Sequence, residues 1–265
     1  KEASLPLPYL GIVLFRGRKL NAFFVTLADK VRGKILRWNA ALLSQAGRLV
    51  LIKSVLDSMG THVFASMSPT SSFFRSYRAL ASSFFWGNKA NARRHHWVSW
   101  EALCRPKNEG GLGLRNPKDL CAAFACKLWY RFGTNDSLWA SFLHAKYRRL
   151  AHSNFSGSPS YASEIWKHMQ SVKPLSDAHG GSIGWDGASF SVLKAWNSIR
   201  TPAPARPVFS FIWDTRIPPK ASVLMWRIIH VGLPLDVNLQ KIGIPFVSRC
   251  RCCGNGEVES LNHLF

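Results

Sequence analysis

The sequence predicts a mainly α-helical protein, in which a helical bundle is followed by a small α-rich domain, with minor β structure at residues 7–14 and 185–192. Three observations predict this fold class. Apolar residues recur at helical spacing in several consecutive stretches. Short connections containing proline or glycine separate these stretches, as in helical bundles. Hydrophobic residues make up 47% of the 265 residues, which is enough to form a core.

The first segment, Leu5–Leu14, is predicted to be extended. Pro6 and Pro8 disfavour a helix, and the β-branched pair Ile12 and Val13 favours a strand. Three amphipathic helices are predicted to follow. The first has an apolar stripe from Leu20 to Trp38, and the second is capped by Ser44 and has an apolar face from Leu49 to Val63. The third is predicted from about Ser72 to Trp86.

The remaining elements follow from the same signals. The glycines at 110–113 indicate a plain turn, because a phosphate-binding loop would need a Gly-Lys-Ser/Thr ending and a preceding strand. Residues 88–96 and the turn at 180–181 are predicted to be loops, and residues 148–161 a domain boundary. Helices are predicted at 117–132, 137–147, 163–172, 192–199, 208–213, 220–231 and 235–242, with a short hairpin at 185–190.

The charge of the chain indicates a polyanionic partner. The net charge is +21 and the isoelectric point is about 10.3, and +17 of this charge lies in the first 150 residues. A solvated basic surface and an anionic lipid are the alternatives. Lipid is disfavoured because no membrane anchor accompanies the basic residues, so we expect RNA or DNA as partner and no membrane. Five basic residues on the first two helices are predicted to contact phosphates without base specificity, with a solvated face as the alternative: Arg32, Lys34, Arg37, Arg48 and Lys53.

The chemistry of the chain collects at its C-terminal end. Cys250 and Cys253 form a C-x-x-C pair, and His263 follows on a run that can form a short helix. Two thiolates and one imidazole are ligands that Zn²⁺ prefers, and a structural site has four. We therefore expect a partial zinc knuckle whose fourth ligand lies beyond Phe265, with Cys252 as a reserve ligand. Ordinary buried thiols remain the alternative, whereas a disulfide is disfavoured because nothing marks the chain as secreted.

The chain begins at Lys1 rather than Met, and no signal peptide precedes it. We expect a fragment, or the product of a broken reading frame, which is not secreted.

An ordered series of motifs resembles the reverse transcriptases of plant non-LTR (LINE-type) retrotransposons, from the end of the polymerase palm onwards. The cysteine-rich tail, with Glu259 and His263-Leu264-Phe265, is similar to their zinc-binding domain, in which a further cysteine follows about five residues after the histidine. The other motifs are Tyr9-Leu10-Gly11, Trp38, Leu43–Arg48, Leu51–Leu56, Phe85-Trp86-Gly87, Trp97–Trp100, Gly110–Gly113, Ile217–Lys220, Met225–Arg227 and Leu233-Pro234.

This resemblance implies a division of the chain and a set of partners. Residues 1–16 would be the end of the palm, 17–150 a thumb-like helical region that grips template and primer, 151–179 a linker with a helix, and 180–265 the zinc-binding domain, truncated at its C-terminus. It also implies Zn²⁺ as cofactor, the upstream palm as partner, and a location in the nucleus or cytoplasm. The parent activity would be RNA-directed DNA polymerase.

No catalytic residues are predicted in this chain. Polymerisation needs several carboxylates that converge on two metal ions, and the sequence contains no Asp-Asp pair. The chain is therefore expected to be a nucleic-acid-binding module and not an enzyme on its own. The alternative is a non-functional retroelement remnant, or a helical protein-interaction module that does not bind nucleic acid.

Overall fold

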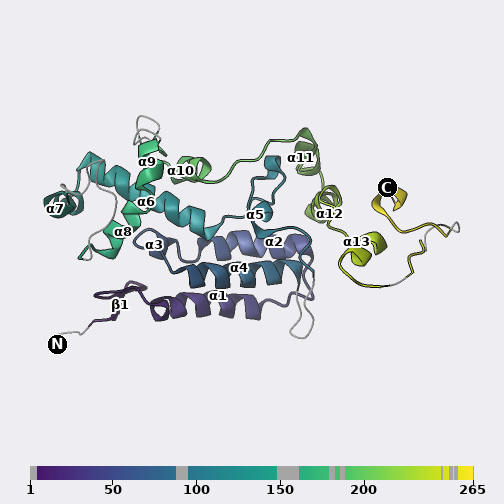
Figure 1. The fold of residues 1–265 in the computed structure, drawn as a ribbon, viewed down its shortest axis with the longest axis horizontal. Helices are drawn as coiled ribbons and strands as arrows, with labels where there is room; N and C mark the ends of the chain where they lie inside the picture. Colours follow the sequence, from purple (N-terminus) through teal and green to yellow (C-terminus); the bar gives the residue numbers. More distant parts are fainter. Residues whose placement is uncertain are drawn as a thin grey trace. The chain divides into compact units, whose positions relative to one another are not determined.

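The computed structural model describes residues 5–87, 95–147, 161–178, 183–185, 189–245, 247–250, 253 and 256–264. It is mostly helical, with one small two-stranded sheet, which confirms the predicted mainly α fold class (Figure 1). The predicted loop at 88–96, the boundary at 148–161, the turn at 180–181 and the reserve ligand Cys252 lie largely or wholly outside the described residues. Within the described part, no helix is both long and apolar enough to cross a membrane.

The chain forms two compact units. The first contains residues 1–39, 50–81 and 114–203, and the second contains residues 40–49, 82–113 and 204–265.

The first unit begins with an antiparallel hairpin of β1 (Leu7–Tyr9) and β2 (Ile12–Leu14), in which Pro8 lies opposite Val13. Leu10 and Gly11 connect the strands with φ values of +47° and +80°. Positive φ at both turn residues is typical of the tight turns that match the twist of two antiparallel strands. The predicted extended segment is thus a hairpin.

The predicted first helix is confirmed as η1 (Asn21–Phe24) followed by α1 (Val25–Arg37), which buries Leu27 and Val31. Ser44 begins α2 (Gln45–Ser54), and its Oγ accepts a hydrogen bond from the Gly47 backbone N–H at 3.1 Å. A serine at this position satisfies one of the N–H groups that have no partner within the helix.

The prediction that this second helix continues to Val63 is wrong. The chain leaves the helix after Ser54 and forms η2 (Leu56–Ser58) and then α3 (Thr61–Phe64). Gly60 stands between them with φ of +86°, a conformation that ends a helix and that glycine adopts without strain. The apolar spacing of this stretch continues through the break, so periodicity alone does not show it.

α4 (Ser71–Trp86) matches the predicted third helix and contributes a row of aromatic side chains to the core. Phe73 is buried, and its ring lies 6.3 Å from that of Phe64 and 6.4 Å from that of Phe24. These contacts connect α3, η1 and α4 around one apolar centre.

The rest of the first unit packs around α6 (Pro117–Thr134), whose first turn is fixed by Pro117 and by Asn116, the side chain of which accepts from the Lys118 N–H. Three further helices contact α6: α7 (Leu138–Tyr147), α8 (Glu164–Gln170) and α10 (Val192–Ile199). The unit also contains α9 (Lys173–Ala178), which was not predicted. Trp166 is fully buried and stacks on Tyr147 with ring centroids 4.4 Å apart. The predicted β structure at 185–192 reduces, among the described residues, to one bridge between Trp185 and Phe190, because Val192 already starts α10.

The second unit contains α5 (Trp100–Leu103), η3 (Lys107–Glu109), α11 (Pro207–Ile212), α12 (Pro219–Ile229), α13 (Asp236–Lys241) and α14 (Leu261–Leu264). The carbonyl oxygen of Gly110 is a shared acceptor in this unit. It accepts hydrogen bonds from Trp226 Nε1 and His230 Nε2, each at 2.7 Å. Gly110 has φ of +84°, and a Cβ there would lie 2.8 Å from the ring of Phe209. The predicted plain turn therefore also packs against Phe209 and accepts side-chain hydrogen bonds from α12 and His230.

Candidate metal centre and basic surface

The three predicted zinc ligands lie close together at the end of the second unit. Cys250 follows α13 and is buried, whereas Cys253 and His263 are half-buried. Their ligand atoms all lie within 4.8 Å of one another. Among the described residues, they are the only group of three or more cysteine, histidine or acidic side chains that could share one ion.

Backbone hydrogen bonds bring these side chains together. The Cys250 N–H donates to the carbonyl of Glu257 at 2.7 Å, which closes the loop that carries Cys253. At the start of α14, Ser260 Oγ accepts from the His263 N–H at 3.3 Å. The loop is thus fixed on both sides of the ligands.

A second group of contacts ties this loop to α13. Ser248 Oγ donates to the Asp236 carboxylate at 2.9 Å and accepts from the Glu259 N–H at 3.0 Å. The Val237 N–H donates to the Glu259 carbonyl at 3.4 Å. α13 therefore supports residues 256–260, the segment that leads to His263.

The two nitrogens of His263 have different partners. Nε2 lies 3.0 Å from Cys253 Sγ, and Nδ1 lies 2.6 Å from Glu257 Oε2. Interaction with the Cys250 thiol and with Glu257 raises the pKa of His263 above its ordinary value. A carboxylate on one ring nitrogen leaves the other nitrogen for a metal ion, which is a common arrangement around bound zinc.

The donor set fits zinc. In a tetrahedral site the ligands lie about 2.0–2.3 Å from the ion, so two sulfurs and a nitrogen are about 3.5–4 Å apart. The observed grouping needs only a small adjustment to reach this spacing. Cys250, Cys253 and His263 would hold the ion, which would order this loop as a structural site does.

Glu257 was not among the predicted site residues, although its place in the cysteine loop was visible in the sequence. We expect Glu257→Gln to weaken zinc binding by about 10- to 100-fold. The glutamine amide would hold the His263 ring less firmly than the carboxylate does, and it would not increase the basicity of the imidazole as the carboxylate does. The measurement is a competition titration with a chromogenic chelator, together with the absorption spectrum of the Co²⁺-loaded protein.

Glu259→Gln is the matched control for this substitution, because the Glu259 contacts above use its backbone. Equal zinc affinities for the wild type, Glu257→Gln and Glu259→Gln would contradict a positioning role of Glu257.

The structure distributes the five predicted phosphate-contacting residues over two helices. Arg32, Lys34 and Arg37 are exposed on α1 in the first unit. Lys53 is half-buried near the end of α2. Their contact with phosphates stays a prediction.

Arg48 differs from the other four because its guanidinium is engaged within the second unit. Nε and Nη2 donate to the Ala40 carbonyl at 3.1 and 2.7 Å, and Nη1 donates to the Phe85 carbonyl at 3.2 Å. Gly87 lies against it, and a Cβ there would be 2.2 Å from Nη1. The geometry gives Arg48 a structural role that the sequence pattern did not show.

Comparison with known proteins identifies the class of the metal-centre region. Residues 190–265 match the family described as zinc-binding in reverse transcriptase. Cys250, Cys253 and His263 all lie within this range, so the match agrees with the zinc assignment.

A longer stretch resembles a curated protein of Arabidopsis thaliana named "Putative ribonuclease H protein". The two are 30% identical over 176 residues, which cover 65% of this chain and 28% of that protein. The chain thus spans less than a third of the relative it matches. No solved structure matches the chain. Together the two similarities support a protein derived from a retroelement.

Proposed function

We propose that this chain is the nucleic-acid-handling C-terminal part of a retrotransposon reverse transcriptase of the plant non-LTR (LINE-type) class. The observation that carries the proposal is the Cys250–Cys253–His263 group inside the segment that matches the reverse-transcriptase zinc-binding family. The net charge of +21 supports a nucleic-acid partner. In this proposal the first unit contains the thumb-like grip on template and primer, and a fourth zinc ligand lies beyond Phe265.

We expect the chain to bind RNA or DNA with an affinity that falls steeply as salt rises, because bound phosphates release counterions. The triple substitution Arg32→Glu, Lys34→Glu and Arg37→Glu removes three exposed cations of α1. It is expected to reduce the slope of log affinity against log salt by about 2 for a single strand, at about 0.7 per phosphate contact. Fluorescence anisotropy with a labelled oligonucleotide measures both quantities.

The matched control carries the same charge change at exposed residues of α4 and α6: Arg75→Glu, Lys118→Glu and Lys127→Glu. An equal loss in the two triple variants would attribute binding to net charge rather than to α1. A wild-type chain that binds no oligonucleotide at low salt would refute the proposed function.

We further propose that the chain has no polymerase activity on its own. The purified wild-type protein is expected not to extend a primer in the presence of Mg²⁺ or Mn²⁺, since its sequence offers no pair of adjacent aspartates for the metal ions.

A further inference from the structure

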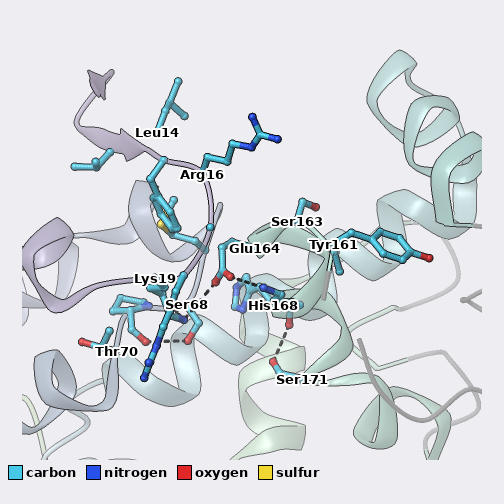
Figure 2. A pocket seen from close by; sticks show the side chains of 18 of the residues that line it. Leu14, Arg16, Lys19, Ser68, Thr70, Tyr161, Ser163, Glu164, His168 and Ser171 are labelled. Carbon is cyan, nitrogen blue, oxygen red and sulfur yellow. Dashed lines mark hydrogen bonds and ion pairs between the residues drawn. The ribbon is translucent and has the colours of Figure 1, made fainter. Parts of the chain in front are cut away.

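The first unit contains a large pocket that none of the predicted site residues lines (Figure 2). Its volume is about 1220 Å³. Three segments line it: residues 13–19, which begin within β2; residues 67–71, which end at the first residue of α4; and residues between 161 and 171, around α8. Small-molecule sites commonly measure about 300–1,000 Å³, so this pocket is large enough for part of a polymer.

The lining of the pocket carries an excess of positive charge. Four basic side chains, Arg16, Arg18, Lys19 and Lys167, line it together with one carboxylate, Glu164. Glu164 lies 3.0 Å from Lys167 and 3.8 Å from Lys19, so its charge is compensated within the pocket (Figure 2).

The two arginines remain available for a ligand. Both are exposed, and within the described part of the chain neither has an ion-pair or hydrogen-bond partner. Lys19, by contrast, is held in place by a 2.6 Å hydrogen bond to the Ser68 carbonyl. The pocket therefore presents two guanidinium groups without a partner among the described residues, beside two lysines that share one carboxylate.

His168 adds no charge to this lining. It is buried, its Nε2 donates to the Phe64 carbonyl at 3.2 Å, and burial lowers its pKa to about 4. The ring is thus neutral at physiological pH, and the positive charge of the lining comes from its two arginines and two lysines.

Hydroxyl groups and the start of a long helix complete the lining. Thr70 and Ser71 stand at the N-terminus of α4, a helix of 16 residues, and Ser163 contributes a further hydroxyl. Helix N-termini and hydroxyls contact phosphate oxygens in many nucleic-acid complexes. Guanidinium groups, hydroxyls and a helix N-terminus together suit a chain of phosphates.

We propose that this pocket binds the phosphodiester backbone of a nucleic-acid strand, through Arg16 and Arg18. The inference rests on the proposed function and deepens it, because it places a second contact region on the first unit, separate from the α1 residues. The strand is RNA or DNA, since the shared phosphodiester is what the lining recognises.

The test is the double substitution Arg16→Glu and Arg18→Glu in the full chain, measured by anisotropy with RNA and DNA oligonucleotides of the same sequence over a range of salt. We expect at least about a tenfold loss of affinity at low salt, and a salt slope reduced by about 1.4 for two lost single-strand contacts. Arg75→Glu with Lys127→Glu is the matched control, because these residues are exposed and do not line the pocket. Arg16→Gln with Arg18→Gln removes the charges without reversing them. We expect this variant to lose less affinity than the glutamate variant, with the same reduction in the salt slope.

The outcomes separate the two proposals. Equal losses in the pocket variant and its control, with wild-type binding intact, would overturn the pocket assignment and leave the proposed function standing. Absence of binding by the wild type would overturn both. Oligonucleotide binding unchanged in the pocket variant, with binding to phosphatidylserine vesicles lost, would assign the pocket to a lipid headgroup and overturn the inference. Circular dichroism of each variant checks that the helices are retained.

Discussion

Asp57→Asn is expected to stabilise the protein at pH 8 and to change its stability little near pH 4. Asp57 Oδ2 accepts a hydrogen bond from the Arg115 N–H at 3.2 Å, whereas Oδ1 is enclosed without a partner among the described residues. The residue as a whole is half-buried, but its carboxylate is not solvated on that side. Desolvation raises its pKa from 3.8 to about 7, against the opposing effects of Arg115 and Lys53.

The direction of this pKa shift determines how the stability of the protein changes with pH. A pKa that is higher in the folded state means that the folded protein holds a proton which the unfolded chain has released, so stability falls as pH rises from about 4 to about 7. The separation of the two pKa values corresponds to at most about 4 kcal/mol, fully lost above pH 7. Asparagine resembles the protonated acid and removes this dependence.

The measurement is the free energy of unfolding by urea at pH 4, 6 and 8. Asp29→Asn, on the exposed side of α1, is the control for loss of one negative charge. If Asp57→Asn raised the free energy of unfolding at pH 8 by no more than Asp29→Asn does, the Asp57 carboxylate would be ionised in the folded protein at little cost in stability.

The second large effect is expected at Arg48. Replacing Arg48 by Met keeps an aliphatic side chain but removes the donors that bind the Ala40 and Phe85 carbonyls. Each hydrogen bond from a charged donor contributes about 1.5–3 kcal/mol, and the contributions are not additive, so we expect a loss of about 3 kcal/mol in stability. Arg48→Lys is expected to lose part of this amount, because an ammonium cannot reproduce the planar fork.

Arg37→Met is the control, since Arg37 is exposed on α1 and belongs to the same predicted set. Its effect on stability is expected to stay within about 0.5 kcal/mol. Thermal and urea unfolding of the three variants distinguish the two roles. Similar stabilities of Arg48→Met and Arg37→Met would remove the structural role of Arg48.

The elements that the sequence predicts well are those with local signals. Ser44, and Asn116 with Pro117, mark the starts of α2 and α6, and the extended Leu5–Leu14 segment forms the hairpin. Periodicity fails at Gly60, where a left-handed residue interrupts an apolar pattern that continues beyond it. α5, with four residues, and α9, with six, are too short for a helical period to be recognised.

The candidate sites divide in the same way. Cys250, Cys253 and His263 lie within one short stretch, so their spacing alone predicts that they meet. Arg16 and Lys167 meet at one pocket only because the chain returns there after some 150 residues, and no local pattern encodes that return. Arg48 looked like a surface cation because its carbonyl partners carry no side-chain signal.

The hydrogen bonds to Gly110 show that the segment matched by the family model depends on residues outside it. The family match begins at residue 190, but the fully buried indole of Trp226 depends on a carbonyl that lies 116 residues earlier in the chain. A piece excised at the start of the match loses that acceptor, and with it the acceptor of His230 and the glycine against which Phe209 packs. The family match is thus a continuous stretch of sequence, whereas the compact unit that contains α11 to α14 also includes residues 40–49 and 82–113.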